Sequence, residues 1–122
     1  MPQVHVHLPQ GYSSETKKEF LSGFKTVLSE AFNVPTKMSS LMMTDFNEGN
    51  FCKDGKRTMF IMISTTLGKP DEQKAKCVKG VHDLCMKYFG DIISGTDIIL
   101  DEHDTRNICQ DGICRYPGMK LY

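Results

Sequence analysis

The residue best suited to chemistry in this sequence is Pro2, which directly follows Met1. Initiator methionine is readily removed before a small residue, and its removal would leave Pro2 with a free secondary amine. An α-amino group has a reference pKa of about 7.7–8.0, closer to neutrality than any other backbone group. An apolar pocket near cations disfavours the charged form of such an amine. We therefore predict that Pro2 can act as a general base that moves a proton between carbon and oxygen.

Met-Pro alone is not specific, so the elements that would position Pro2 must support this interpretation. Residues 3–8 alternate polar and apolar side chains, the period of a half-buried strand. Gly11 interrupts this strand, and apolar side chains at helical spacing then predict a helix up to Ala31. Residues 41–45 predict a second strand.

The second half of the chain repeats this order at a shift of 57 residues. Residues 2–55 align with residues 59–112 without a gap, with nine identical pairs. Strand, helix and strand recur over residues 60–64, after Pro70 and over residues 98–102. Both halves close on Asn-x-Cys-x-Asp-Gly, and Asp-Gly is typical of a tight hairpin turn. We infer that one β-α-β unit is duplicated.

Two β-α-β units side by side predict the fold class. Each unit gives two parallel strands with a right-handed crossover. The pair predicts a single α+β domain over residues 1–122, with one four-stranded mixed sheet and two helices on one face. The other face keeps apolar residues, so we expect oligomerisation to cover it. Residues 113–122 fall outside the repeat and could form a C-terminal arm that pairs with a neighbouring subunit.

Composition and charge argue against several classes of partner. Fifteen basic and fifteen acidic residues balance, so no polybasic surface indicates nucleic acid or anionic membranes. No apolar run approaches the roughly 20 residues of a transmembrane helix, and the N-terminus is not typical of a signal peptide. Five cysteines are an odd count that argues against a disulfide framework, and Cys77 and Cys85 lie on an apolar helix stripe. We expect a cytoplasmic protein with reduced thiols.

The first half resembles the 4-oxalocrotonate tautomerase family of the tautomerase superfamily. The motifs that carry the resemblance are Met1-Pro2, the strand to Leu8, Gly11, Ser-x-Glu ending at Glu15, Pro35, Thr44-Asp45 and Gly49-Asn50-Phe51. The two-unit length is similar to malonate semialdehyde decarboxylase and macrophage migration inhibitory factor. The resemblance implies a homotrimer, Pro2 as catalytic base, Phe51 as an aromatic pocket wall, and neither cofactor nor metal.

The arginines typical of that family are not kept in this chain. Tyr12 and Ser40 stand at the two arginine positions, and their equivalents in the second half are Lys69 and Asp97. The resemblance implies substrate binding at Tyr12 and Ser40 and, as the best remaining cation, at Lys69. A dicarboxylate favours paired cations, so 4-oxalocrotonate itself is not the expected substrate. Tyr12 could donate a hydrogen bond to an enolate oxygen.

Three further charged residues are candidates for the same site. Arg106 and Arg115 are cations near the closing turn and the C-terminal tail. Asp97 would repel an anionic substrate, so it either faces elsewhere or activates water, as a carboxylate does in hydrating relatives. The remaining histidines and methionines fit other roles. His5 and His7 should face away from the helices, His82 and His103 should be solvated, and Met38, Met42, Met43, Met59 and Met62 should fill the core.

The sequence therefore predicts a tautomerase-type isomerase acting on a small 2-keto acid or its enol. Pro2 would remove a proton alpha to a carbonyl and return it, with no cofactor. Met59 aligns with Pro2 in mid-chain, so only one such site is expected per chain. Three alternatives stay open. One is a decarboxylase or hydratase of the same superfamily. Another is a non-catalytic, cytokine-like interaction protein, which the lost arginines favour, and the third is a structural trimer with no ligand.

Overall fold

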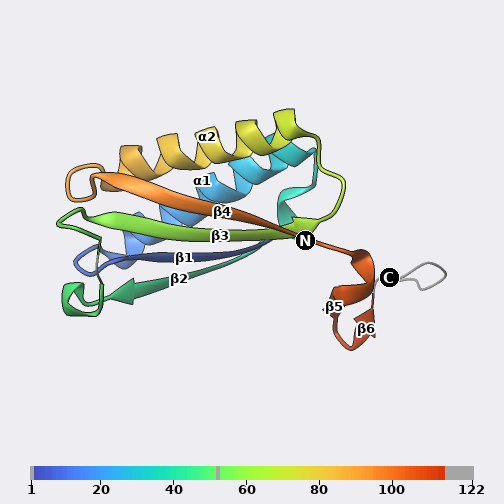
Figure 1. Cartoon of the computed structure of the whole chain (residues 1–122), viewed down its shortest axis with the longest axis horizontal. Helices are drawn as coiled ribbons and strands as arrows, with labels where there is room; N and C mark the ends of the chain where they lie inside the picture. The colour runs from blue at the N-terminus through green and yellow to red at the C-terminus, as the bar shows by residue number, and fades with distance from the viewer. Residues whose placement is uncertain (1, 52, 115–122) are drawn as a thin grey trace.

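The computed structural model describes residues 2–51 and 53–114, so residues 115–122 of the predicted C-terminal arm, including Arg115, lie outside them. The main elements run in the order β-α-β-β-α-β (Figure 1). They are β1 (Gln3–Pro9), α1 (Ser14–Phe32), β2 (Ser40–Phe46), β3 (Thr58–Thr66), α2 (Asp71–Phe89) and β4 (Gly95–His103). Short 3-10 turns are η1 (Thr36–Met38), η2 (Glu48–Asn50) and η3 (Thr105–Asn107), and a hairpin of β5 (Cys109–Gln110) and β6 (Ile113–Cys114) follows.

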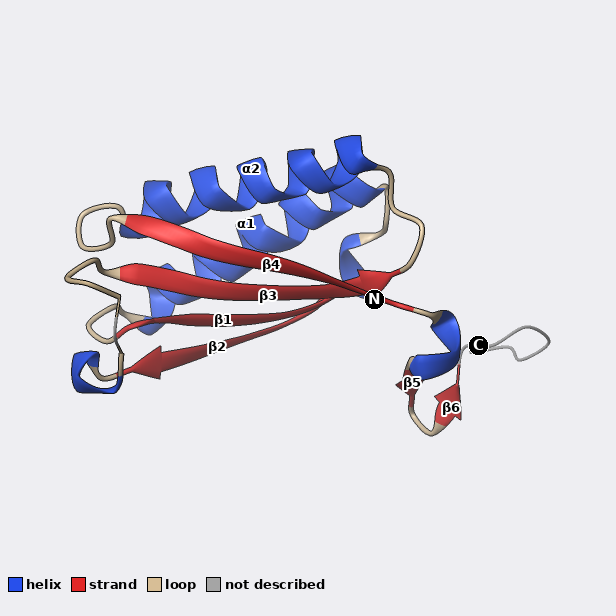
Figure 2. Cartoon of the chain, viewed as in Figure 1, coloured by secondary structure: helices blue, strands red, loops and turns tan. Residues whose placement is uncertain are grey.

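The four long strands form one mixed sheet, in which they lie in the order β2-β1-β3-β4. The outer pairs β1–β2 and β3–β4 are parallel, and the central pair β1–β3 is antiparallel. Both helices lie on the same face of this sheet (Figure 2). The predicted fold class is therefore confirmed.

The core lies between the sheet and the helices. Alternate residues of the central strands are fully buried there, and aromatic side chains of both helices meet them. These residues include Val4, Val6, Leu8, Met59, Ile61 and Ile63 from the strands and Phe20, Phe24, Cys77, Cys85 and Phe89 from the helices. The burial predicted for Cys77 and Cys85 is confirmed.

Glycines let the two helices pack closely. A Cβ atom on Gly80 of α2 would lie 2.8 Å from Val27 Cγ1 of α1. A Cβ atom on Gly23 of α1 would lie 3.1 Å from Leu84 Cδ1 of α2. The two glycines occupy equivalent positions of the repeat, so each helix contributes one glycine that allows the close contact.

The halves correspond in structure as well as in sequence. The bounds of α1 and α2 differ by 57 residues, and so do those of η2 and η3. Asp54 and Gly55 have φ values of 43° and 77°, and Asp111 and Gly112 have 52° and 78°. Two successive positive φ angles are those of the tight turn predicted for Asp-Gly, and in the second half this turn joins β5 to β6.

The face of the sheet opposite the helices has no cover in the described chain. The strand register places Met42, His5, Met62 and Ile99 in one row across this face. Met42 and Met62 are 53% and 44% exposed, so their predicted place in the core is wrong. The alternation of a strand shows which residues share a face, but not which face the helices cover. His5 lies on this face, as predicted.

Two expectations about single residues also need correction. Cys109 is disulfide-bonded, so the expectation of reduced thiols does not hold for this exposed residue of the hairpin. His82 was expected to be solvated, but it is partly buried. Its Nδ1 lies 2.8 Å from Thr96 Oγ1 at the start of β4. Within the described residues, no helix has the length and apolar character needed to cross a membrane.

Candidate functional site

Strand directions divide the sheet into two chemically different ends. β1 and β2 begin at the end where β3 and β4 finish, which we call the Pro2 end. The opposite end, where β3 begins with a fully buried Met59, is the Met59 end. In Figure 1 the Pro2 end lies on the right, beside the hairpin of β5 and β6. The seven residues of β1 separate the two ends by about 20 Å, at roughly 3.3 Å per residue.

Pro2 is buried at the start of β1 and is fixed by the neighbouring strand. Its carbonyl oxygen accepts a hydrogen bond of 3.0 Å from the backbone N–H of Ser40. Gln3 pairs in register with Ser40 on one side and with Ser64 on the other. A cavity of about 230 Å³ opens beside these residues, and its lining includes Gln3, Ser40, Ser64, His103, Asn107 and Ile108.

Lys69 lies at the same end, in the loop between β3 and α2. Its Nζ atom is 5.5 Å from the centre of the Phe32 ring. Glu102 of β4 holds this loop, because its carboxylate accepts a 3.1 Å hydrogen bond from the N–H of Gly68. The ammonium of Lys74 forms an ion pair with Glu102, and this hydrogen-bonded partner keeps the pKa of the carboxyl below its usual value. The loop carrying Lys69 is thus fixed to the end of β4.

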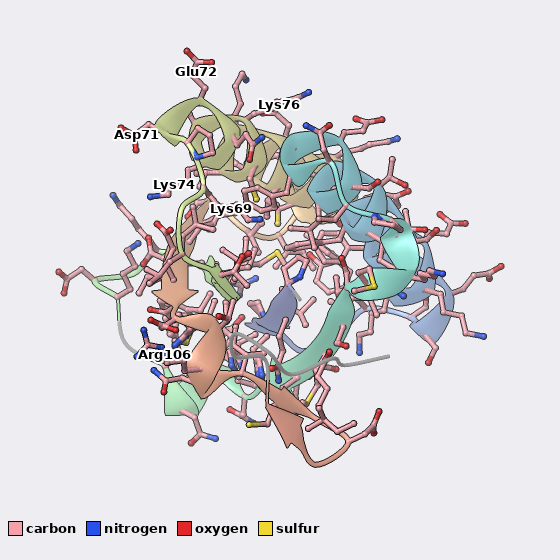
Figure 3. All side chains as sticks on the ribbon, turned by 90° about the vertical axis from the view of Figure 1, so that its right-hand side faces the viewer. Lys69, Asp71, Glu72, Lys74, Lys76 and Arg106 are labelled. Carbon is pink, nitrogen blue, oxygen red and sulfur yellow. The ribbon has the colours of Figure 1, made fainter. Side chains whose placement is uncertain are left out.

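Arg106 places a second cation at the Pro2 end. It belongs to η3, and its backbone N–H donates a 2.9 Å hydrogen bond to Asp104 Oδ1. Its Nε atom lies 3.7 Å from the same oxygen, and the side chain is largely exposed. Figure 3 views this end of the molecule and labels Lys69 and Arg106 on different segments around it. Of the five substrate-binding residues that the sequence predicts, Ser40, Lys69 and Arg106 are therefore at the same end as Pro2.

Tyr12 does not reach Pro2 of its own chain. It follows β1 at the Met59 end, where its hydroxyl lies 3.3 Å from both the Phe89 carbonyl oxygen and Asp91 Oδ1. Burial, and then the Asp91 carboxylate, raise the pKa of Tyr12 to about 12. Within one chain this hydroxyl cannot hold an enolate at Pro2, because the length of β1 lies between them.

Phe51 is also at the Met59 end. Its ring packs 5.3 Å from Phe46 and 5.1 Å from Phe60, measured between ring centres. It therefore cannot form a wall of the Pro2 cavity in the same chain. Its repeat equivalent Ile108, which is 5% exposed, lines that cavity instead. Ile108 lies 57 residues after Phe51, so the repeat relates the two residues. The sequence alone does not show that the two units pair in antiparallel fashion, which is what brings Ile108 to the Pro2 end.

The comparison with solved structures, and not those with family models or curated proteins, identifies the fold. No protein-family model matches this chain, and no curated protein matches it. Among solved structures, a fused 4-OT described as a wild-type asymmetric trimer matches with a TM-score of 0.85 at 19% identity, covering 93% of this chain and 96% of that one. The chain has the tautomerase superfamily fold. The resemblance expected from the sequence is thus confirmed at the level of the fold.

Two other solved structures share this fold. A malonate semialdehyde decarboxylase, described with decarboxylase and hydratase activities, matches with a TM-score of 0.76 at 16% identity over 88% of this chain and 89% of that one. A protein inactivated by 2-oxo-3-pentynoate matches with a TM-score of 0.83 at 18% identity, covering 91% and 93%.

Asp97 forms an ion pair with Lys53, and the pair lies far from the Pro2 end. Lys53 Nζ donates to both of its carboxylate oxygens, at 2.7 and 2.8 Å. Asp97 pairs in register with Phe60, near the start of β3, and so lies at the Met59 end. Within one chain it cannot activate a water molecule beside Pro2.

Proposed function

We propose that this protein is a tautomerase-type isomerase in which Pro2, freed by removal of Met1, is the general base. The observation that carries the proposal is the position of Pro2. It is buried directly before β1 and hydrogen-bonded to Ser40, and both Ser40 and the next residue, Gln3, line a cavity of about 230 Å³. A catalytic base needs a fixed direction and a cavity that admits a small substrate, and this place offers both.

The reaction requires only a proton transfer between carbon and oxygen. The amine of Pro2 takes a proton from the carbon alpha to a carbonyl, and the negative charge moves to the oxygen. A donor at the Pro2 end stabilises that enolate, and Lys69 is a cation at this end that could serve. Protonated Pro2 then returns the proton to give the tautomer. No electron transfer takes place and no cofactor is required.

The surroundings of Pro2 favour a small 2-keto acid or its enol as the substrate. The lining of the cavity contains neutral hydrogen-bonding groups from Gln3 and Asn107, which suit a carbonyl or enol oxygen. Lys69 and Arg106 can attract the carboxylate. Arg106 is already paired with Asp104, which favours one carboxylate over two.

We also propose that the protein works as a homotrimer. The row of Met42, His5, Met62 and Ile99 leaves large apolar side chains in water on the free sheet face. Contact with other copies would bury them, and apolar burial is the main driving force of association. The trimers described for fused 4-OT proteins of the same fold support this choice. Tyr12 and Phe51 could approach Pro2 only from such a neighbouring copy.

A decarboxylase or hydratase is the second candidate, because the decarboxylase structure shares this fold. Hydration needs a group that activates water, and the ion pair of Asp97 with Lys53 at the Met59 end does not provide one within the chain. Decarboxylation needs only a protonated Pro2 and a cation near the carboxylate. We therefore place decarboxylation second and hydration third.

The proposed activity can be tested by following the enol-to-keto conversion of phenylpyruvate by ultraviolet absorbance. Protein whose intact mass shows loss of Met1 is compared with the Pro2→Ala variant. We expect kcat/KM to fall by at least about 100-fold, the usual range for loss of a general base. Pro9→Ala is the matched control, because it makes the same substitution at the other end of β1.

Three results would count against the proposal. Equal rates for wild type and Pro2→Ala would remove the proline base. Equal losses in Pro2→Ala and Pro9→Ala would indicate damage to the strand. A wild-type protein inactive on several 2-keto acid enols would leave the decarboxylase or the interaction protein as the better interpretation, and release of carbon dioxide from a 3-oxo acid would separate those two.

A further inference from the structure

A buried hydroxyl lies at the Pro2 end and belongs to Ser39, the residue directly before β2. The side chain of Ser39 is only 4% exposed. Its Oγ atom has no hydrogen-bond partner among the described residues. Taking a hydroxyl out of water costs free energy unless it is hydrogen-bonded, and buried hydroxyls in folded proteins nearly always have a partner. The Ser39 hydroxyl is therefore a polar group whose partner has to be identified.

The backbone on both sides of this hydroxyl is fixed. The N–H of Ser39 donates to the Thr36 carbonyl oxygen at 3.3 Å. The N–H of the next residue, Ser40, donates to the Pro2 carbonyl oxygen at 3.0 Å. The parallel register of β1 with β2 begins at Gln3 and Ser40. Continued back by one residue, this register places Ser39 beside Pro2, and both residues are buried.

The second half of the chain contains the same arrangement with a partner in place. At the shift of 57 residues, Pro2 corresponds to Met59 and Ser39 to Thr96. Met59 pairs in register with Thr96, which supports the equivalent pairing of Pro2 with Ser39. The Thr96 hydroxyl lies 2.8 Å from Nδ1 of His82 on α2. In this half, a helix side chain therefore satisfies the hydroxyl.

The first half differs in both the helix residue and the strand residue. The equivalent of His82 on α1 is Lys25, which forms no hydrogen bond with Ser39. The equivalent of Met59 is Pro2, which gains a free amine when Met1 is removed. A secondary amine has one N–H in its neutral form and two when it is protonated. The hydroxyl that lacks a helix partner thus lies beside the one strand residue that can gain a donor.

We propose that the Ser39 hydroxyl accepts a hydrogen bond from the amine of Pro2 after removal of Met1, and so positions the catalytic base. With one N–H held by Ser39 Oγ, the lone pair of the neutral amine has a fixed direction for proton transfer. Ser39 acts through Pro2 and does not touch the substrate, so it is a positioning residue. The inference rests on the proposed function of Pro2, but the contact itself can be tested without a substrate.

The charge of the amine changes the strength of this contact. A hydrogen bond to a charged donor is stronger than one to a neutral donor, so Ser39 favours protonated Pro2. Other ionisable groups at this end also act on the amine, but Ser39→Ala alters none of them. They include His5 on β1, Glu30 on α1, Lys37 on η1, Lys69 before α2, Lys74 and Lys76 on α2, Glu102 and His103 on β4, and Asp104 and Arg106 at η3.

The test follows the titration of the Pro2 amine in the full chain by NMR, with proline labelled by a nitrogen isotope. Intact mass first shows that the chain begins at Pro2. The variants are Ser39→Ala and Ser39→Thr, which keeps a hydroxyl. Thr96→Ala is the matched control, because it removes the equivalent hydroxyl at the other end of the sheet. The urea midpoint of each variant and the pH profile of kcat/KM for phenylpyruvate are measured in parallel.

We expect Ser39→Ala to lower the pKa of the Pro2 amine by about 1, because hydrogen bonds to charged groups are worth roughly twice those to neutral ones. The acid limb of the pH profile should move to lower pH by the same amount. Ser39→Thr should restore the wild-type value. Thr96→Ala should leave the amine unchanged and lower the urea midpoint instead, because His82 loses its partner.

An amine pKa that is equal in wild type and Ser39→Ala would overturn the proposal. A hydroxyl that stays unpaired gives this result together with a higher urea midpoint, because its removal relieves a buried polar group. Equal changes of the amine pKa in Ser39→Ala and Thr96→Ala would also overturn it. Failure of the proposed reaction is seen separately, as wild-type kinetics in Pro2→Ala while the amine still responds to Ser39→Ala.

Discussion

At the scale of single residues, Tyr12 is held by hydrogen bonds within its own chain and lies far from Pro2 of that chain. Its hydroxyl is engaged by Phe89 and Asp91 at the Met59 end. Tyr12→Phe should therefore leave kcat/KM for phenylpyruvate within about two-fold. It should lower the free energy of unfolding by about 0.5–1.5 kcal/mol, the usual worth of one hydrogen bond. Urea denaturation and the kinetic assay check the two parts.

Tyr12 also predicts that the stability of the folded protein depends on pH in the alkaline range. The pKa of Tyr12 is raised to about 12 in the folded protein, whereas an unfolded tyrosine titrates near 10. Between these values the unfolded chain has lost the proton and the folded chain has kept it, so stability falls as pH rises. Tyr12→Phe should remove this part of the decline. A large drop in kcat/KM in the same variant would instead show that Tyr12 acts on the substrate.

At the scale of elements, equivalent ion pairs in the two halves allow a matched comparison. Lys74 with Glu102 holds the loop of Lys69, and Lys17 with Asp45 (2.6 Å) is the counterpart at the Met59 end. Glu102→Gln should raise KM several-fold, because the loop at Gly68 loses its charged acceptor. Asp45→Asn should not change KM. Equal effects of the two variants on KM would contradict a positioning role for Glu102.

Glu102 should also contribute to acid sensitivity. Its pKa is lowered in the folded state, so its contribution to stability is present above the unfolded pKa of a carboxyl. This contribution is lost as pH falls through the lowered folded value. The difference in urea midpoint between wild type and Glu102→Gln should therefore shrink as the pH is taken below about 4, the range of unperturbed carboxyl pKa values.

The close contact between α1 and α2 predicts that adding one methyl group at Gly80 lowers the stability of the protein. Gly80→Ala should improve helix propensity by about 1 kcal/mol, but the new Cβ would lie 2.8 Å from Val27. Overpacking usually costs about 1–3 kcal/mol, so we expect a net loss of stability of about 1 kcal/mol. The double variant with Val27→Ala should recover part of that loss. A more stable Gly80→Ala protein would show that the helices separate easily.

The elements themselves follow from local sequence patterns. Alternation in β1 and the apolar spacing of α1 depend on neighbouring residues, and such patterns fix the type of element. Asp-Gly predicted the turn at Asp111 because that pair readily adopts positive φ. The exposure of Met42 could not be predicted this way, because it depends on which face of the finished sheet receives the helices.

At the scale of the whole molecule, the antiparallel pairing of β1 with β3 decides which residues meet. It brings Lys69 and Ile108 to the Pro2 end and takes Tyr12 and Phe51 to the other. The resemblance predicts Tyr12 and Phe51, and the repeat predicts Lys69, but neither states how the two units pair. The sequence therefore predicts the strand that follows Pro2 correctly, but it combines residues from both ends of the sheet when it assembles the rest of the site.

The free sheet face predicts how the molecule associates. Met62→Glu places a charge in the centre of the row formed by Met42, His5, Met62 and Ile99. Burying that charge would be costly, so the variant should sediment as a monomer at concentrations where wild type is a trimer. Lys18→Glu, on the exposed side of α1, is the control. A wild-type protein that sediments as a monomer at all concentrations would contradict the predicted trimer.

We propose that the protein has a reactive proline amine in a pocket for keto acids, and covalent labelling is a direct test of this proposal. The protein is treated with 2-oxo-3-pentynoate, the reagent that inactivated one protein of the same fold. The adduct is then located by intact mass and peptide mapping. We expect one adduct per chain, on Pro2 after loss of Met1, and phenylpyruvate should reduce the labelling in proportion to its concentration. A chain that keeps Met1, remains unlabelled, or is labelled elsewhere without protection by phenylpyruvate would contradict it.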